Sequence, residues 1–500
     1  MKKSMLLSLL TSLVIPLPGA SFLEAETTHT IAPIKQLTPD EARADFDLLR
    51  KALEEAHTGL YRYSTKAEMD RTFDTERARL NRPLMETEFL AVTAEMLATI
   101  KCGHTGCEPG EATKAAIKET RLFPLRVLLE GPRLMVLLND TPDNPAIRPG
   151  MEIVEINGHK ASDIVSRFMP LLSGDGDVET GKRHDIVGKF SQLYWTFVEQ
   201  TSDFTVKAID TTGHTVIAKL AGVTDAERKV NKNPVNDAML AGIGKLMEWP
   251  KENQSLRFLK EEQIAEIRLR YFVGDDFRRW VEATFKTLRE KRTESLIIDL
   301  RGNGGGEDMF GALLVSYLTD KPFHYFDHID VKTFTPTFTA YSDWNVRNED
   351  QLREGMTPNP AGGYFVKPQL HGGVAEQSSA EVPFLGKVFI LTDGGTFSTG
   401  ADFCAITHHL KRATFIGEET GGGYYGNNSG MDTILTLPNS KVRIGLPMYE
   451  YWNAVSGYDG KRRGTIPDHI VPLTTADILR GVDAQLDLAL RLATTHATSK

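Results

Sequence analysis

A turn of small residues, "DGGTFSTGADF" from Asp393 to Phe403, lies between an apolar run typical of a strand and a run typical of a helix. Within it, Ser398 is placed where a strand-to-helix turn could expose a hydroxyl nucleophile. Serine is also a common helix N-cap residue, and glycine-rich turns are frequent. The turn alone therefore favours a capped helix over a nucleophile, and the rest of the chain has to decide between them.

A serine nucleophile needs a base that takes its proton, and His104 in the compact loop "KCGHTGC" is the best candidate. A structural loop histidine and a metal ligand are the alternatives, although Cys-x-His-x-x-Cys lacks an evident fourth ligand. His408 and His409 follow Ser398 on the same expected helix, about three turns away, and are poor bases.

Stabilisation of a tetrahedral intermediate requires paired N–H donors, and the loop "DLRGNGGG" could supply them. This loop lacks the lysine and hydroxyl residue of a phosphate-binding P-loop and the spacing of a dinucleotide-binding motif. An oxyanion hole is thus the functional interpretation, and a plain tight turn is the alternative.

Composition restricts the class of protein. The 500 residues are 41% hydrophobic and 25% charged, with a formal net charge of -9, which argues against a nucleic-acid-binding protein. Residues 1–25 combine a positive start, a short apolar run and small residues, as in a secretory signal peptide. We therefore expect a periplasmic or secreted protein with no membrane span after cleavage, in which Cys102 and Cys107 could form a disulfide.

The chain divides into segments of different pattern. Amphipathic helices are predicted over 35–118, a β-rich module over 119–225 and an irregular polar connector over 226–255. Strands and helices alternate over 256–495, which predicts a layered α/β domain. Three of the glycine-bearing loops follow predicted strands of this domain, where sites usually form.

Taken in order, six motifs resemble those of the tail-specific (C-terminal processing) serine peptidase family. They are "KCGHTGC", "RPGMEIVEINGHKASDI", "LIIDLRGNGGG", "VFILTDGGTFSTGADF", "FIGEETGGG" and "RGTIPDHIV". The resemblance implies a crotonase/Clp-protease-like α/β core, an N-terminal helical domain and a PDZ-like module that holds peptides by strand addition. It also implies Ser398 as the nucleophile, with oxyanion donors from the backbone of Gly304 or Gly305 and of Thr399.

The sequence departs from the Ser–Lys members of the family, because the position 25 residues after the serine is Gly423. It is instead similar to the branch of the tricorn protease core and interphotoreceptor retinoid-binding protein, in which a histidine at the position of His104 activates the serine. The orienting acid stays open between Glu450 and Glu419.

The expected function is hydrolysis of peptide bonds in a polypeptide substrate, without a cofactor or metal. The alternative is a non-catalytic protein that binds peptides or apolar ligands on the same fold. The sequence does not predict the substrate, the cleavage preference or the oligomeric state.

Overall fold

The computed structural model describes residues 34–142, 144–246, 252–260, 263–345 and 349–494. The predicted signal peptide lies outside these residues. Among the helices described, none has the length and apolar character needed to cross a bilayer.

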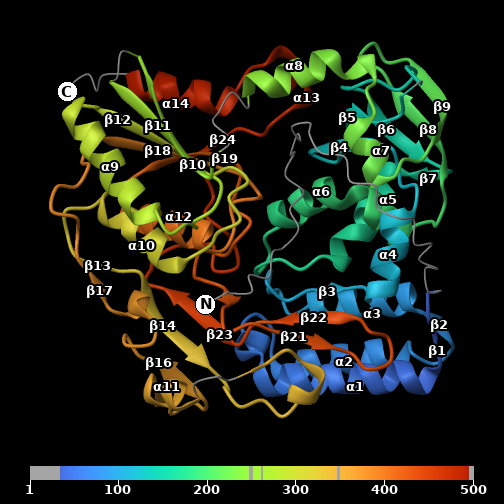
Figure 1. Cartoon of the computed structure of the whole chain (residues 1–500), viewed down its shortest axis with the longest axis horizontal. Coiled ribbons are helices and arrows are strands. Elements are labelled where there is room, and N and C mark those ends of the chain that lie inside the picture. The colour runs from blue at the N-terminus through green and yellow to red at the C-terminus, as the bar shows by residue number, and fades with distance from the viewer. Residues whose placement is uncertain (1–33, 143, 247–251, 261–262, 346–348, 495–500) are drawn as a thin grey trace, which may run out of the picture.

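A six-stranded sheet forms the centre of the α/β half of the molecule (Figure 1), in the order β10-β11-β12-β18-β19-β24. The first pair is antiparallel and the others are parallel. The strands are β10 (Gln254–Leu259), β11 (Ile264–Leu269), β12 (Ser295–Asp299), β18 (Lys387–Thr392), β19 (Thr414–Gly417) and β24 (His469–Ile470).

Helices cover both faces of this sheet, which explains why its strands are apolar without alternation. In β12, Leu296 and Ile298 pack on one face and Ile297 on the other. The first face carries α9 (Phe277–Glu290), α10 (Asp308–Ser316) and α12 (Thr399–His409), and the second carries α14 (Ala484–Thr494) (Figure 1). The mixed α/β class expected from the sequence is confirmed.

Residues 35–118 are mostly helical, with four helices: α1 (Pro39–Ala56), α2 (Lys66–Ala78), α3 (Glu86–Ala98) and α4 (Glu111–Glu119). A capping box starts α1, because Thr38 accepts from the Glu41 N–H and the Glu41 carboxylate accepts from the Thr38 N–H. Helices α1, α2 and α3 share their core with a distant hairpin of β21 (Thr433–Thr436) and β22 (Arg443–Leu446), to which β3 (Cys107–Glu108) adds a third strand.

An antiparallel sheet spans the predicted β-rich module in the order β4-β5-β6-β8-β9, with β7 paired to β6. Its strands are β4 (Leu125–Glu130), β5 (Arg133–Asn139), β6 (Glu152–Ile156), β7 (His159–Lys160), β8 (Asp203–Ile209) and β9 (Thr215–Ala221). Two helices, α5 (Ala161–Phe168) and α6 (Thr180–Phe197), pack on this sheet.

The prediction that residues 226–255 are irregular is wrong. It contains most of α7 (Asp225–Val230), the whole of α8 (Asp237–Leu246) and the start of β10. Helix α8 packs against α13 (Thr475–Arg480) so closely that a Cβ on Gly242 would lie 1.7 Å from the Ile478 carbonyl oxygen. This contact with a segment far along the chain stabilises a helix that local sequence does not predict.

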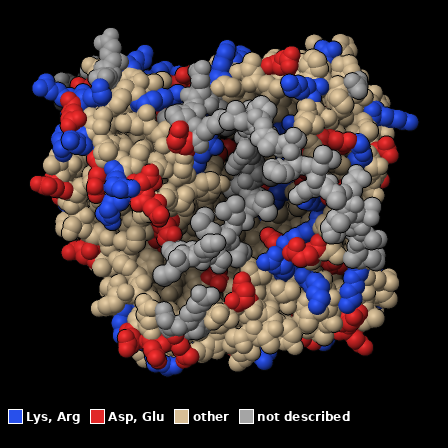
Figure 2. All heavy atoms as spheres, viewed as in Figure 1, with Lys and Arg blue, Asp and Glu red and all other residues tan. Residues whose placement is uncertain are grey.

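A second sheet, β15-β16-β14-β23-β20, flanks the α/β layers, and short elements complete the described chain. The sheet comprises β14 (Phe326–Val331), β15 (Met356–Pro358), β16 (Tyr364–Val366), β20 (Asn428–Ser429) and β23 (Tyr449–Asn453). The short elements are β1 (Gln36–Leu37), β2 (Leu84–Met85), β13 (Phe323–His324), β17 (Glu376–Gln377), α11 (Glu349–Glu354) and the 3-10 turns Thr58–Tyr61, Met169–Leu171, Pro234–Asn236, Thr339–Tyr341 and Gly372–Val374. Acidic and basic side chains are interspersed on the face shown in Figure 2.

Glu266, in the middle of β11, is a completely buried carboxyl group in the central sheet. Its Oε2 accepts from Arg257 Nε at 2.6 Å, whereas its Oε1 has no hydrogen-bond partner in the described chain. Desolvation raises the pKa of Glu266 to about 7, and the attraction of Arg257 only partly opposes this shift.

We predict that Glu266 makes stability fall as the pH rises. Its folded-state pKa lies above the unfolded value of 4.5, so the folded state loses stability as the pH rises from 4.5 through about 7. Glu266→Gln cannot ionise at this position. The difference in free energy of unfolding between this variant and the wild type should therefore shift in favour of the variant by up to about 3 kcal/mol between about pH 4.5 and pH 8. Urea unfolding at both pH values checks this, with the exposed Glu294→Gln as control. Parallel pH dependence of wild type and Glu266→Gln would contradict it.

Candidate active site

Ser398 lies where β18 gives way to α12, in a backbone conformation that is unusual for serine. Its φ of 53° and ψ of -132° are those of the first central residue of a type II′ turn, a position that glycine normally occupies. The Gly400 N–H closes this turn by donating to the Phe397 carbonyl at 3.0 Å. Such strain costs about 1–3 kcal/mol and persists only where the surroundings impose it.

The neighbouring loop holds the two residues before Ser398 through hydrogen bonds. The Phe397 N–H donates to the Asn303 carbonyl at 2.9 Å, and Thr396 Oγ1 donates to the Leu300 carbonyl at 2.8 Å. The Ser398 side chain makes no capping hydrogen bond to α12, although the residue occupies the N-cap position. The alternative of a helix-capping hydroxyl therefore does not describe this serine, whose side chain is half-buried.

The glycine loop after β12 packs directly on Ser398. A Cβ on Gly305, whose φ is +97°, would lie 2.6 Å from the Ser398 Cβ and 3.0 Å from the Thr399 nitrogen. Only glycine fits at this contact. The Gly305 N–H, however, donates to Asn303 Oδ1 at 2.9 Å. Within the described chain the N–H groups of Gly304 and Thr399 have no partner, so the expected oxyanion donors narrow to these two.

A polar cluster that the sequence did not reveal fixes the residue after the serine. Thr399 Oγ1 lies 2.8 Å from the Gly306 carbonyl and 3.0 Å from Asp308 Oδ1. His371 Nδ1 accepts from the Gly373 N–H, so its Nε2 carries the proton and donates to Asp308 Oδ2 at 3.1 Å. Neither Asp308 nor His371 lies in a motif that sequence reasoning singled out.

His104 lies beside the serine turn, although it is far from Ser398 in the sequence. Its ring stacks on Phe397, the residue before Ser398, with a centroid separation of 4.5 Å and an interplanar angle of 30°. Its Nδ1 is buried and has no hydrogen-bond partner in the described chain, and no hydrogen bond there joins its ring to Ser398. Catalytic hydrogen bonds are often long without substrate, so the stacked pair is compatible with a serine and its base.

The two acids expected to orient His104 form ion pairs with arginines instead. Glu450 on β23 pairs with Arg62 at 3.5 Å. Glu419 accepts from Arg463 and from the Gly464 N–H, at 2.6 to 2.8 Å. Asp432, an exposed residue just before β21, forms no hydrogen bond with His104 in the described chain. Surrounding protein raises the pKa of Asp432, and the nearby His104 opposes this shift. Sequence reasoning missed Asp432, which lies outside the six motifs.

The possible bridge between Cys102 and Cys107 is not formed, and the three cysteines are free thiols. The Cys102 sulfur accepts from Thr105 Oγ1 at 3.0 Å and contacts the Asn428 carbonyl, while Cys107 contacts the Leu90 carbonyl on α3. The two side chains thus have separate partners on either side of the His104 loop. Among the described residues, no group of three His, Cys, Asp or Glu side chains is placed to hold a metal ion.

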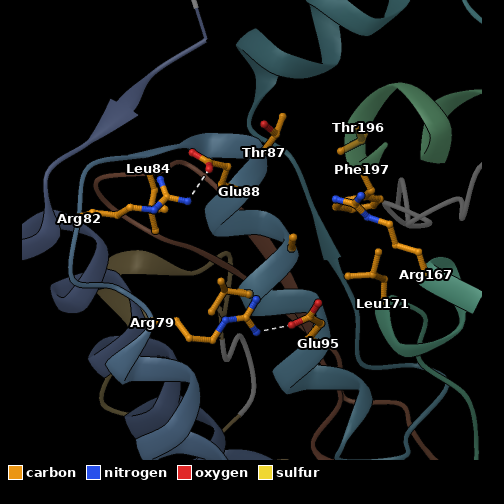
Figure 3. Close-up of a pocket in the computed structure, with 12 residues that line it drawn as sticks. Arg79, Arg82, Leu84, Thr87, Glu88, Glu95, Arg167, Leu171, Thr196 and Phe197 are labelled. Carbon is orange, nitrogen blue, oxygen red and sulfur yellow. Dashed lines mark hydrogen bonds and ion pairs between the residues drawn. The ribbon is translucent and has the colours of Figure 1, made fainter. Parts of the chain in front are cut away.

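The pocket in Figure 3 is separate from this site. Its volume is about 260 Å³, and α3 lines it together with residues of α5, α6 and the 3-10 turn after α5. The ion pairs Arg79–Glu95 and Arg82–Glu88 form part of its lining (Figure 3). None of the predicted site residues lines it.

Comparison with known proteins identifies the segment that carries Ser398. Residues 263–471 match the model of peptidase family S41. The matched segment makes up less than half of the chain and includes Ser398. The match confirms the resemblance to this peptidase family seen in the sequence and indicates a serine-type peptidase.

Two solved structures share the fold of this chain over most of its length. Mature CPAF has 14% sequence identity and a TM-score of 0.59, with 91% of this chain and 96% of that chain covered. A point mutant of CPAF has 13% identity and a TM-score of 0.61, with 92% and 99% covered. No curated protein resembles the chain significantly in sequence.

The strain at Ser398 yields a prediction about stability. Ser398→Gly should exceed Ser398→Ala in free energy of unfolding by about 1 kcal/mol, because glycine adopts this conformation without a Cβ clash. Urea unfolding of the two variants measures the difference. The exposed Ser166 within α5 is the control, since there alanine should be the more stable residue. The same order of stability at both positions would refute strain at Ser398.

Proposed function

We propose that this chain is a secreted or periplasmic peptidase in which Ser398 attacks the substrate carbonyl carbon and His104 takes the serine proton. The imidazolium then returns the proton to the leaving amine, and water hydrolyses the acyl-enzyme by the same route. The observation that carries the proposal is the convergence on Ser398 of the stacked His104–Phe397 pair and the Gly305 contact.

The oxyanion of each tetrahedral intermediate would accept hydrogen bonds from the backbone N–H groups of Gly304 and Thr399. Three features support this pair. Both N–H groups lack a partner in the described chain, Thr399 begins α12, and its hydroxyl is tied to the loop that carries Gly304. The positive end of the α12 dipole adds to the stabilisation.

The proposed organisation follows the segments seen in the sequence. A signal peptide (1–25) precedes a helical domain (35–118), a PDZ-like module (119–225), a connecting segment (226–255) and a crotonase/Clp-protease-like catalytic domain (256–495). The antiparallel sheet of the module, with two helices packed on it, supports the PDZ-like assignment. A substrate peptide would add as a strand to this module.

The alternative is a non-catalytic protein that binds peptides or apolar ligands. Two observations favour it: no carboxylate is hydrogen-bonded to His104 in the described chain, and neither is Ser398. A triad without its third member still retains activity, so these observations reduce the expected rate rather than exclude catalysis.

Labelling with a fluorophosphonate tests the function directly. Peptide mapping should locate the label on Ser398 in the mature wild-type protein. Ser398→Ala should abolish labelling, and His104→Ala should slow it by at least about 100-fold, because the hydroxyl loses its base.

The exposed His324→Ala serves as the matched histidine control and should label at the wild-type rate. A folded wild-type protein that takes no label would support the binding-protein alternative. A His104→Ala variant that labels at the wild-type rate would exclude His104 as the base.

A further inference from the structure

The structure assigns Asp175 a role that no sequence motif indicates: it positions the His104 loop against the nucleophile turn. This inference rests on the proposed function, in which His104 is the base. Asp175 lies between α5 and α6, in the β-rich module rather than in the α/β half that carries Ser398.

The Asp175 carboxylate bridges two loops beside Ser398. Oδ1 accepts from the Gly103 N–H at 2.7 Å, and Oδ2 accepts from the Gly423 N–H at 3.2 Å. Gly103 precedes His104. Gly423 follows Gly422, where a Cβ would lie 3.3 Å from the Ser398 nitrogen. One side chain thus joins the loop of the base to the loop that packs on the nucleophile.

Burial makes this arrangement costly unless both hydrogen bonds form. Asp175 is 1% exposed and makes no ion pair within the described ranges. A buried carboxylate without a cation depends on N–H donors for its stabilisation. The two loops therefore cannot separate from Asp175 without leaving a buried charge unsatisfied.

The residues beside Asp175 hold the same loop at alternate positions. Ser173 Oγ donates to the Thr105 carbonyl at 2.5 Å, and the Gly176 N–H donates to the Lys101 carbonyl at 3.0 Å. On its other side, Gly103 faces Phe397, whose ring carbons would lie 2.7 Å from a Cβ at residue 103. The His104 loop is thus enclosed between this segment and the Phe397 ring on which His104 stacks.

The start of α6 extends this contact to the nucleophile turn itself. A Cβ on Gly394 would lie 2.2 Å from the Thr180 carbonyl oxygen, and a Cβ on Gly395 would lie 2.7 Å from the His184 ring. The segment from Ser173 to His184 therefore touches the base loop, the glycine-rich loop and the nucleophile turn. Asp175 is its one buried carboxylate, and we expect it to set the distance between the imidazole and the hydroxyl.

Asp175→Asn tests the positioning role with little change of shape. The amide can accept only one of the two N–H bonds and turns its own N–H group towards the other. A displacement of about 1 Å at the base can cost about 100-fold in rate, so we expect fluorophosphonate labelling of Ser398 to slow by about 10- to 100-fold. Hydrogen exchange at the Gly103 and Gly423 amides should become faster.

Asp45→Asn is the matched control. Asp45 is also completely buried and accepts from two backbone N–H groups, those of Asn439 at 3.0 Å and Ser440 at 2.6 Å, away from the serine turn. This variant should lose comparable thermal stability and keep the wild-type labelling rate and the wild-type exchange at Gly103 and Gly423.

The double variant with His104→Ala separates positioning from general destabilisation. If Asp175 acts through His104, Asp175→Asn should cause no further loss of labelling once His104 is absent. An equal loss in both backgrounds, or a wild-type rate in Asp175→Asn, would overturn the inference. If the wild type itself takes no label, the proposed function fails. Hydrogen exchange then decides on the loop contact, and unchanged exchange at Gly103 and Gly423 would overturn it.

Discussion

The backbone conformation of Ser398 is the constraint on which the rest of the site depends. A serine adopts this glycine-type conformation only where its surroundings impose it, and here the loop after β12, about 100 residues earlier in the chain, imposes it. Leu300 and Asn303, after β12, bind the turn through their carbonyl groups, and Gly305 leaves room for the Ser398 Cβ. The result is a half-buried serine whose hydroxyl does not cap its own helix.

The loop that imposes this conformation is itself anchored by buried charge. Arg301 donates to Asp299 at the end of β12 and to Asp483 just before α14, all at 2.8 to 2.9 Å. These carboxylates raise the pKa of Arg301, and Arg301 lowers the pKa of Asp299, although burial opposes both shifts. Breaking such a buried pair leaves an uncompensated charge. Movement of the loop away from these carboxylates would therefore be strongly destabilising.

Tertiary contacts must bring His104 to Ser398, because the two residues are almost 300 positions apart in the sequence. The N-terminal helices meet the C-terminal half through a shared apolar core with the hairpin of β21 and β22. That core brings the His104 loop near, and the aromatic contact with Phe397 together with the Asp175 bonds fixes its orientation. Apolar burial supplies affinity without direction, whereas stacking and hydrogen bonds supply the direction.

The sequence by itself determined the local elements, because their causes are local. Thr38 and Glu41 cap α1, strands form within the predicted β-rich stretch 119–225, and the motif order indicated the peptidase family. The tertiary structure alone decided which groups meet. Glu450 and Glu419 pair with arginines, the Gly305 N–H is taken by Asn303, and Asp175 and Asp308 join the site from outside every motif. Such choices depend on distances between segments far apart in the chain, and no local propensity encodes them.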